Sequence, residues 1–165
     1  MTHADLVARG LKWLGNRCTI AFSELATAAM EIPDGWGYGG DGSILVECKA
    51  TRSDFLADAK KYYRRRPEAG MGNLRYYLCP PGLIRPEELP EAWGLLYCLP
   101  KQIKVVVKAR PQEANLDAER RLLASVVRRC ALRWPIHQVQ DMETMPGRSR
   151  AADCASETAS QAHVD

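Results

Sequence analysis

Apolar residues recur along the chain at spacings that predict helices and strands. Leu6, Val7, Leu11 and Leu14 follow helical spacing and fit the buried face of an amphipathic helix over residues 3–15. Residues 17–22 then form a run rich in strand-favouring side chains. The pattern therefore predicts a helix followed by a strand in the first part of the domain.

Residues 31–51 have the pattern of a β-hairpin. A strand over 31–38 is followed by a glycine-rich tip, 39–42, and by the run 43–46, which leads into residues 47–49. Glycine beside aspartate at the tip is a two-residue turn signal. A turn centred on residues 40 and 41 pairs Gly39 with Gly42 and, further along the strands, Asp34 with Glu47. We therefore expect both carboxylates on the same face of the sheet.

The rest of the chain predicts one helix, three strands and a second helix. Ser53 can cap a helix over residues 53–66, whose expected buried face carries Phe55, Ala59, Tyr62 and Tyr63. Strands are expected over 74–79, 93–99 and 103–108, the last two as a hairpin. A long amphipathic helix should then pack on the sheet through a stripe that comprises Leu116, Leu123, Val127, Cys130 and Trp134.

Composition limits the class of protein. The chain has 165 residues, 46% of them hydrophobic and 26% charged, which is typical of one globular domain and is expected over residues 1–138. The small polar residues of 139–165 predict a disordered tail. No apolar stretch approaches the roughly 20 residues of a membrane helix, and the N-terminus lacks a secretory pattern. We therefore expect a cytoplasmic protein without a membrane partner.

Cysteine and histidine positions argue against a soft-metal site. The six cysteines include no C-x-x-C pair, which favours buried free thiols over disulfides or bound zinc. The three histidines, at positions 3, 137 and 163, form no ligand pattern with one another. The net charge of +3 is too small to indicate a nucleic-acid partner by itself, so local clusters of charge must decide.

Asp34, Glu47 and Lys49 form a group that can do chemistry. Two opposed carboxylates repel each other, and a cation between them removes that penalty. Their oxygens suit a hard divalent ion, Mg²⁺ or Mn²⁺. Lys49 lies on the same face as Glu47, roughly 6.6 Å further along the strand, where its ammonium can reach a phosphate oxygen or a water. Such a group can hydrolyse phosphodiesters. Separately, the parts also fit a β-turn triplet over 33–35 and a chance Glu-x-Lys in a solvated strand.

The order and spacing of these residues resemble a known family. Pro33-Asp34, followed after twelve residues by Glu47-Cys48-Lys49, is similar to the motif of the PD-(D/E)XK superfamily, which contains restriction endonucleases and many repair nucleases. Residues 47–55, with the lysine pair at 60 and 61, resemble the E-x-K-x-S-x-x-D-F signature of MmcB-like DNA-repair proteins and phage nucleases. Residues 70–80 resemble the strand that follows in phage-encoded relatives. The resemblance spans about residues 5–110.

This resemblance implies a fold and a metal site. The fold is α/β and restriction-endonuclease-like, with a mixed β-sheet flanked by helices in αβββαβ order, to which this chain adds a C-terminal helix. Asp34, Glu47 and the backbone carbonyl of Cys48 would hold Mg²⁺ or Mn²⁺, and Lys49 would position the attacking water. Glu24, just after the first strand, matches the extra acid that such nucleases place beside the metal; a capping pair or solvated turn explains it equally well.

The chain also departs from the family. Members with a downstream Gln-x-x-x-Tyr element have glutamine where this chain has Asp58, four residues before Tyr62. Asp58 or Lys60 must therefore take over the function of that glutamine, or the function is absent. This departure from the family therefore affects how the protein would handle its substrate.

A basic run follows the expected site directly. Residues 60–66 contain five cationic and two aromatic side chains. Phosphate contact explains such a run, and a solvated helix end that complements the helix dipole is the alternative. We expect the nucleic-acid-binding residues to be Lys60, Lys61, Tyr62, Arg64, Arg65 and Arg66.

Together these features predict a Mg²⁺-dependent deoxyribonuclease that acts in phage or bacterial DNA repair, recombination or processing. An alternative from another class is a nucleic-acid-binding accessory protein that has the same fold but no turnover. A third hypothesis is a subunit that works as a homodimer, which the apolar loop around Leu83, Ile84 and Leu89 suggests. Binding and cleavage experiments distinguish the first two.

Overall fold

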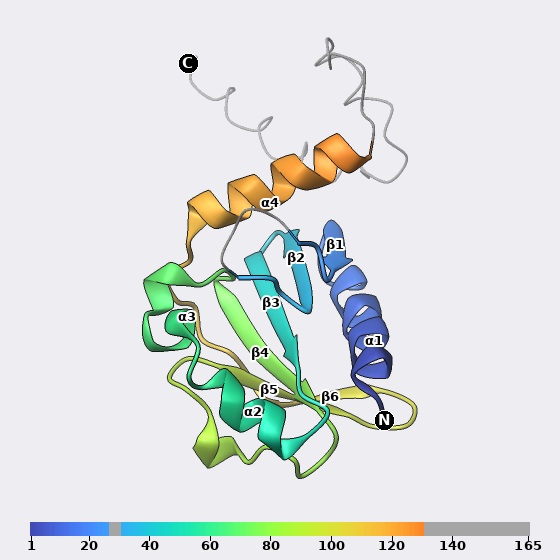
Figure 1. The fold of residues 1–165 in the computed structure, drawn as a ribbon. Coiled ribbons are helices and arrows are strands. Elements are labelled where there is room, and N and C mark those ends of the chain that lie inside the picture. The colour runs from blue at the N-terminus through green and yellow to red at the C-terminus, as the bar shows by residue number, and fades with distance from the viewer. Residues whose placement is uncertain (27–30, 131–165) are drawn as a thin grey trace, which may run out of the picture. The chain divides into compact units, whose positions relative to one another are not determined.

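One mixed β-sheet runs through the domain, with helices on both of its faces (Figure 1). The computed structural model describes residues 1–26 and 31–130, so the predicted tail over 139–165 and the end of the predicted 1–138 domain lie outside the described residues. Strands β1 to β3 are antiparallel, β3 to β5 are parallel, and β6 is antiparallel to β5. The predicted α/β class is therefore confirmed. In sheet order the described strands are β1 (Ile20–Ser23), β2 (Gly35–Gly39), β3 (Gly42–Cys48), β4 (Leu74–Cys79), β5 (Gly94–Cys98) and β6 (Ile103–Val107).

The two faces of the sheet are covered by different helices. Helix α1 (His3–Gly15) packs its apolar side on the face that carries Val46 and Cys48. Helices α2 (Arg52–Asp58) and α4 (Leu116–Arg129) contribute to the core on the opposite face, which carries Leu45. Side chains alternate along a strand, so Glu47 follows Leu45 and lies on the face away from α1. The short helix α3 (Tyr62–Arg65) follows α2.

The hairpin formed by β2 and β3 has the predicted register. Gly39 pairs with Gly42 and Gly35 with Val46, so the next residues along the two strands are Asp34 and Glu47. The turn is closed by Gly42 at a φ of 90°, a conformation that glycine adopts readily. A Cβ at that position would lie 2.9 Å from the side-chain oxygen of Asn73, so a larger residue would also displace that side chain.

The single helix predicted over residues 53–66 is wrong, because the chain forms two short helices. Thr51, rather than Ser53, caps α2 by accepting a hydrogen bond from the backbone of Asp54. Helix α2 ends at Asp58 and α3 begins at Tyr62. The predicted buried face is correct for Phe55, whereas Ala59 and Tyr62 are exposed. The break has consequences for the site, since it changes which side chains turn inward.

The buried stripe predicted for the last helix is correct only in part, because Leu123 packs against the core that contains Leu45 whereas Cys130 is exposed. Leu116 and Val127 are about half exposed, at 52% and 51%, and the buried residues of α4 are Glu119, Leu122 and Ser125. The carboxylate of Glu119 sets this face, because it accepts hydrogen bonds from the Trp36 indole and from the backbone of Gly72. The predicted stripe member Trp134 lies outside the described residues.

The apolar loop that suggested a dimer faces inward. Ile84 is fully buried, and Leu83 and Leu89 pack against the core that contains Leu45. This loop therefore gives no support to the homodimer hypothesis. Among the described cysteines, Cys48, Cys79 and Cys98 are buried free thiols as predicted, whereas Cys18 is half-buried and Cys130 exposed. Within residues 1–26 and 31–130, no helix is long and apolar enough to cross a membrane.

Candidate active site

Asp34 and Glu47 meet where the β2–β3 hairpin ends. Asp34 is the residue before β2, and its Oδ2 atom accepts a hydrogen bond of 2.7 Å from the backbone N–H of Cys48. Burial, and then the negative charge of Glu47, raise the pKa of Asp34 to about 6. The two acids are therefore close enough to repel each other, which is the arrangement that the hairpin register predicted.

The two oxygens of Glu47 have different surroundings. The side chain is only 2% exposed. Its Oε2 atom accepts a hydrogen bond of 3.1 Å from Lys49 and lies 3.1 Å from Nη2 of Arg64. Its Oε1 atom is buried and has no hydrogen-bond partner. A buried carboxylate oxygen without a partner is costly, so this atom is where a cation or a water would be stabilised.

Lys49 is held between two acids. Its Nζ atom donates hydrogen bonds to Glu47 and, at 3.0 Å, to Oδ1 of Asp58. Burial by itself would lower the pKa of Lys49, but the charges of Glu47 and Asp58 outweigh it and raise that pKa. The ammonium therefore stays protonated at neutral pH. Lys49 can orient a water or stabilise negative charge, but it cannot serve as a general base.

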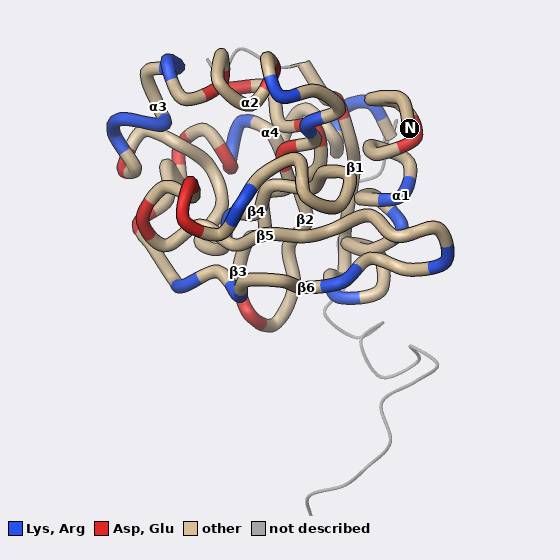
Figure 2. Tube along the Cα trace, turned by 90° about the horizontal axis from the view of Figure 1, so that it is seen from below, with Lys and Arg blue, Asp and Glu red and all other residues tan. Residues whose placement is uncertain are grey.

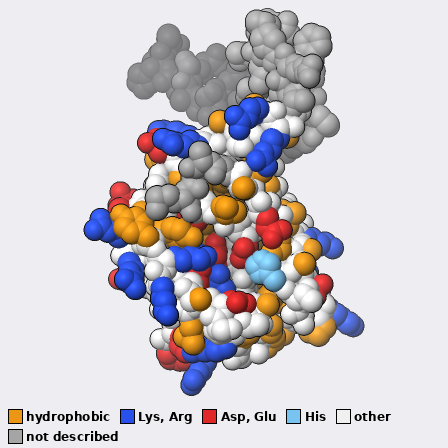
Figure 3. All heavy atoms as spheres, in the orientation of Figure 1, with side chains coloured by type: hydrophobic (Ala, Val, Ile, Leu, Met, Phe, Trp, Pro, Cys, Tyr) orange, Lys and Arg blue, Asp and Glu red, His pale blue; other side chains and the backbone are white. Residues whose placement is uncertain are grey.

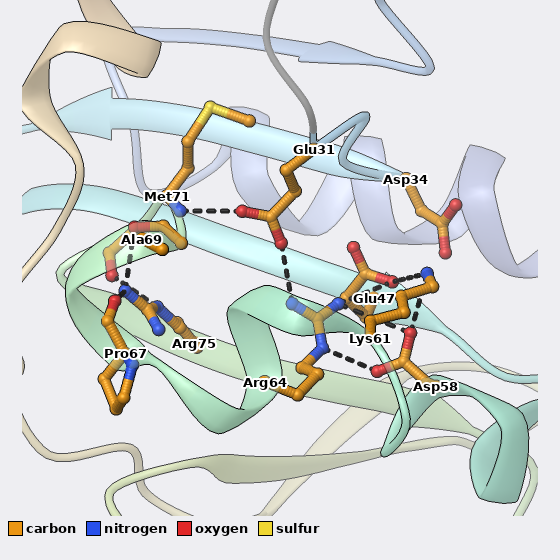
Figure 4. Close-up of polar contacts among 12 residues, drawn as sticks. Glu31, Asp34, Glu47, Asp58, Lys61, Arg64, Pro67, Ala69, Met71 and Arg75 are labelled. Atoms are coloured by element: carbon orange, nitrogen blue, oxygen red, sulfur yellow. Dashed lines mark hydrogen bonds and ion pairs between the residues drawn. The ribbon is translucent and has the colours of Figure 1, made fainter.

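Asp58 is the centre of a buried ion network, shown in Figure 4. One of its oxygens contacts Lys49 and Lys61, and the other accepts hydrogen bonds from Arg64 at 2.6 Å and Tyr77 at 2.8 Å. Burial alone would raise the pKa of Asp58, but the charges of Arg64 and Lys49 hold it well below its usual range. Of the two residues expected to replace the family's glutamine, Asp58 is thus in the cluster, whereas Lys60 is exposed.

The prediction that Arg64 belongs to the nucleic-acid-binding surface is wrong, because this residue lies in the interior. Its side chain is 2% exposed and its guanidinium contacts Glu31, Glu47 and Asp58. The break between α2 and α3 explains the error. On one continuous helix the side chains of Asp58 and Arg64 would point about 120° apart, at about 100° per residue. The break lets both side chains turn toward Glu47.

Glu31 was not identified from the sequence as a site residue. It is buried, and its carboxylate accepts hydrogen bonds from Arg64 at 2.6 Å and from the backbone of Met71 at 2.7 Å. Its neighbour Ile32 is 50% exposed. An exposed isoleucine beside a buried glutamate reverses the usual pattern, so nothing in the hydrophobic pattern marks Glu31 as buried.

Glu24 and His3 lie at the rim of the site. Nε2 of His3 is 3.6 Å from Asp34 and 3.8 Å from Glu24. Glu24 is 62% exposed and has a φ of 48°, which is uncommon for a residue other than glycine. Glu24 and Asp34 thus lie on either side of the same imidazole, that of His3, which the sequence pattern did not indicate.

The remaining basic residues of the run 60–66 are on the surface. Figure 2 shows basic positions gathered around α3, and in Figure 3 basic side chains lie beside the acidic centre of the same face, with histidine on its other side. Lys61 joins surface and interior, because it is 42% exposed while its Nζ lies 2.8 Å from Asp58. The other exposed members are Lys60, Tyr62, Arg65 and Arg66.

The donor set can be compared with what a divalent ion requires. In the described part of the chain, no three His, Cys, Asp or Glu side chains are arranged to hold a metal ion. The thiol of Cys48 belongs to the core beneath α1, so only the backbone of Cys48 faces this site. Two carboxylates remain, Asp34 with its raised pKa and Glu47 with an unpartnered oxygen. Both features fit a hard cation, since added positive charge relieves the repulsion.

Comparisons with known proteins add the fold alone. No protein-family model matches the chain, and no curated protein matches it. A solved structure, the SPO1766 protein of unknown function from Silicibacter pomeroyi, has a similar fold with a TM-score of 0.61. It is 23% identical to this chain, and the match covers 91% of this chain and 97% of that one. The arrangement of side chains must therefore carry any functional conclusion.

Proposed function

We propose that this protein is a metal-dependent nuclease of the PD-(D/E)XK type, which hydrolyses phosphodiester bonds in DNA. The observation that carries the proposal is the pair formed by Asp34 and Glu47. One acid has its pKa raised to about 6, and the other has a buried oxygen without a partner. Both are stabilised if a divalent cation binds between them.

The order of elements supports the same proposal. Helix α1 is followed by β1, β2 and β3, then by α2 with α3, and then by β4. This is the αβββαβ order that the sequence resemblance implied. The acids and Lys49 come from the end of the hairpin and the carboxyl end of β3, which agrees with the positions of the motif residues in that resemblance.

The chain's own residues define what each group would do. Asp34, Glu47 and the backbone carbonyl of Cys48 would hold the ion, with Glu24 at the rim. A bound divalent ion supplies a more acidic water and neutralises phosphate oxygens. Lys49, kept protonated, orients the attacking water or stabilises the developing negative charge.

Asp58 acts through Lys49. Its carboxylate fixes the ammonium at 3.0 Å, so the position of Lys49 depends on Asp58. The Tyr77 hydroxyl and the Arg64 guanidinium fix Asp58 in turn. Asp58 is therefore a positioning residue, and the proposed role requires no contact between its carboxylate and the substrate.

The exposed basic residues beside the site would contact DNA phosphates. Lys61 lies at the mouth, while Arg65 and Arg66 lie on the surface of α3 and just after it. Arg66 also stacks over the ring of Tyr62, at 5.4 Å from its centroid. Each phosphate contact of this kind makes binding more sensitive to salt.

A cleavage assay tests the proposal. Purified protein is incubated with labelled duplex, single-stranded and branched DNA, with Mg²⁺, Mn²⁺ or EDTA. We expect metal-dependent cleavage that falls by about 100-fold or more in Lys49→Ala and in Asp34→Ala, the size of loss typical for removing one electrostatic catalytic group. Lys101→Ala, an exposed lysine in the β5–β6 turn, is the matched control and should cleave like wild type. Undiminished cleavage in both site variants would exclude this active site.

One observation favours a second function, a DNA-binding accessory protein without turnover. The buried acids beside Lys49 are already paired with cations of the chain itself, and the described residues contain no ready group of three metal-binding side chains. Such a protein would bind DNA in EDTA with strong salt dependence and would cleave no substrate. Calorimetric titration with Mn²⁺ separates the two functions, because heat of binding that is lost in Glu47→Gln but kept in the exposed Glu91→Gln supports the enzyme.

A further inference from the structure

Three buried acids of the site face three cations. Glu31, Glu47 and Asp58 are each at most 3% exposed. Their partners are Lys49, Lys61 and Arg64, which contact them over distances of 2.6 to 3.9 Å. This part of the site is therefore close to electrical neutrality without any bound ion.

Five of the six oxygens of these acids are occupied. Both oxygens of Glu31 accept hydrogen bonds, one from Arg64 and one from the backbone of Met71. Both oxygens of Asp58 are likewise engaged, by Lys49 and Lys61 on one side and by Arg64 and Tyr77 on the other. The oxygen that remains is Oε1 of Glu47.

Glu47 is consequently divided between two environments. Its Oε2 belongs to the neutral network of Lys49 and Arg64. Its Oε1 has no hydrogen-bond partner, and the carboxylate is near Asp34. Among the described residues, Asp34 accepts a hydrogen bond from the backbone N–H of Cys48 and lies 3.6 Å from His3, and the charge of Lys49 acts on it without an ion pair. Negative charge that lacks a buried cationic partner is thus confined to the Asp34 side of Glu47.

We infer that the site binds one divalent ion, on the Asp34 side of Glu47, and that Arg64 occupies the place in which a second ion would need ligands. The inference rests on the proposed metal-dependent function and specifies its stoichiometry. In two-metal sites the ions lie about 3.5–4 Å apart and share ligands between them. Here the second oxygen of Glu47, and the two nearest buried acids, are already used by fixed cations.

Arg64 supplies the positive charge that a second ion would supply, but none of its other functions. Its guanidinium contacts the carboxylates through Nε, Nη1 and Nη2, so its charge is delivered to all three acids at once. Because its side chain is 2% exposed, it is enclosed by protein and does not reach a substrate as placed here. A fixed cation cannot be removed by chelators, so only the ion beside Asp34 is exchangeable.

Metal stoichiometry tests the inference without measuring activity. Wild-type protein is titrated with Mn²⁺ by calorimetry, and the Mn²⁺-loaded sample is examined by electron paramagnetic resonance. We expect one ion per chain and the spectrum of an isolated ion. Two ions per chain, with the spin coupling of neighbouring ions, would overturn the inference and leave the proposed nuclease standing. No binding at all would overturn both.

Arg64→Ala tests the role of the guanidinium directly. Removing it exposes the oxygens of Glu31, Glu47 and Asp58, so we expect two ions per chain and a larger rise in Tm with Mn²⁺ than in wild type. The control is Arg65→Ala, which changes the neighbouring exposed arginine and should still bind one Mn²⁺ ion per chain. One ion in a folded Arg64→Ala protein contradicts the inference. If the variant does not fold, the wild-type stoichiometry and spectrum still decide.

Discussion

Asp58 and Asp34 are the same residue type in one cluster, yet they have opposite environments. Asp58 contacts two lysines, an arginine and a tyrosine, and its pKa is held well below the usual range. Asp34 has one backbone hydrogen bond and a histidine at the rim, and its pKa is raised to about 6. Environments that shift the pKa values of two carboxyl groups in opposite directions indicate different roles, one structural and one chemical. The carboxylate of Asp58 is fully paired within the chain, whereas a bound cation would stabilise the carboxylate of Asp34.

The largest expected effect is the loss of stability in Asp58→Ala. This change removes one of the two acids that Lys49 and Arg64 share and leaves their buried charges incompletely paired, and breaking a buried ion pair typically costs about 3–5 kcal/mol of unfolding free energy. Urea unfolding at pH 7 measures it. The matched control is Asp54→Ala, an exposed acid in the first turn of α2, which should lose less than about 1 kcal/mol.

The pH dependence of stability sharpens this result. A folded-state pKa below the unfolded value stabilises the protein above about pH 4, and this contribution is lost as the pH falls through the folded pKa. The gap between wild type and Asp58→Ala should therefore narrow in acid. A constant gap from pH 7 to pH 3 would show that Asp58 contributes packing rather than charge.

Asp34→Asn should change the free energy of unfolding in the opposite direction to Asp58→Ala, by stabilising the protein. Because the pKa of Asp34 rises from 3.8 to about 6 on folding, the charged form weakens the fold. This loss begins as the pH rises through about 4 and is complete above about 6. At roughly 1.4 kcal/mol per pKa unit, the neutral amide should stabilise the protein by about 1–3 kcal/mol at pH 8 and by almost nothing at pH 4.

Thermal unfolding with and without Mn²⁺ measures this prediction. Manganese should raise the Tm of wild type at pH 8 and have little effect on Asp34→Asn, because the amide carries no charge to bind the ion. A destabilised Asp34→Asn at pH 8 would mean that the hydrogen bond to Cys48 matters more than the repulsion from Glu47.

Glu24→Gln should produce the smallest effect. This acid is 62% exposed at the rim, so water screens its charge. We expect Mn²⁺ affinity to fall by about 3- to 10-fold, against a loss of binding in Glu47→Gln. Calorimetry at low and at high salt measures both, and the Glu24 effect should shrink as salt increases. An effect as large as that of Glu47→Gln would place Glu24 among the direct ligands.

The sequence was most informative where local rules decide the structure. Strand alternation and the glycine-rich tip were enough to predict the β2–β3 register, and with it the approach of Asp34 to Glu47. The strand β4 and the β5–β6 hairpin were predicted for the same reason. In each case the deciding contacts join neighbouring strands or a short turn, so the pattern of side chains contains the information.

The rest of the site depends on contacts between distant segments. Glu31 and Arg64 are 33 residues apart in sequence, and their pairing requires the break between α2 and α3. No helix-breaking glycine or proline occurs between Asp58 and Tyr62. On α4 the acid Glu119 is buried on the same face as Leu122, which the predicted stripe did not include. Buried charges thus override hydrophobic periodicity where they have partners.

The pairing of β2 with β3 also restricts how this part of the chain can change length. Inserting one residue within β3, before Glu47, would shift the following residues by one position, which moves their side chains to the opposite face. The thiol of Cys48 would then enter the polar cluster, and the carboxylate of Glu47 would point into the apolar layer beneath α1. Length changes tolerated within β3 should therefore occur in even numbers, because only these keep the carboxylate of Glu47 on the face of the cluster.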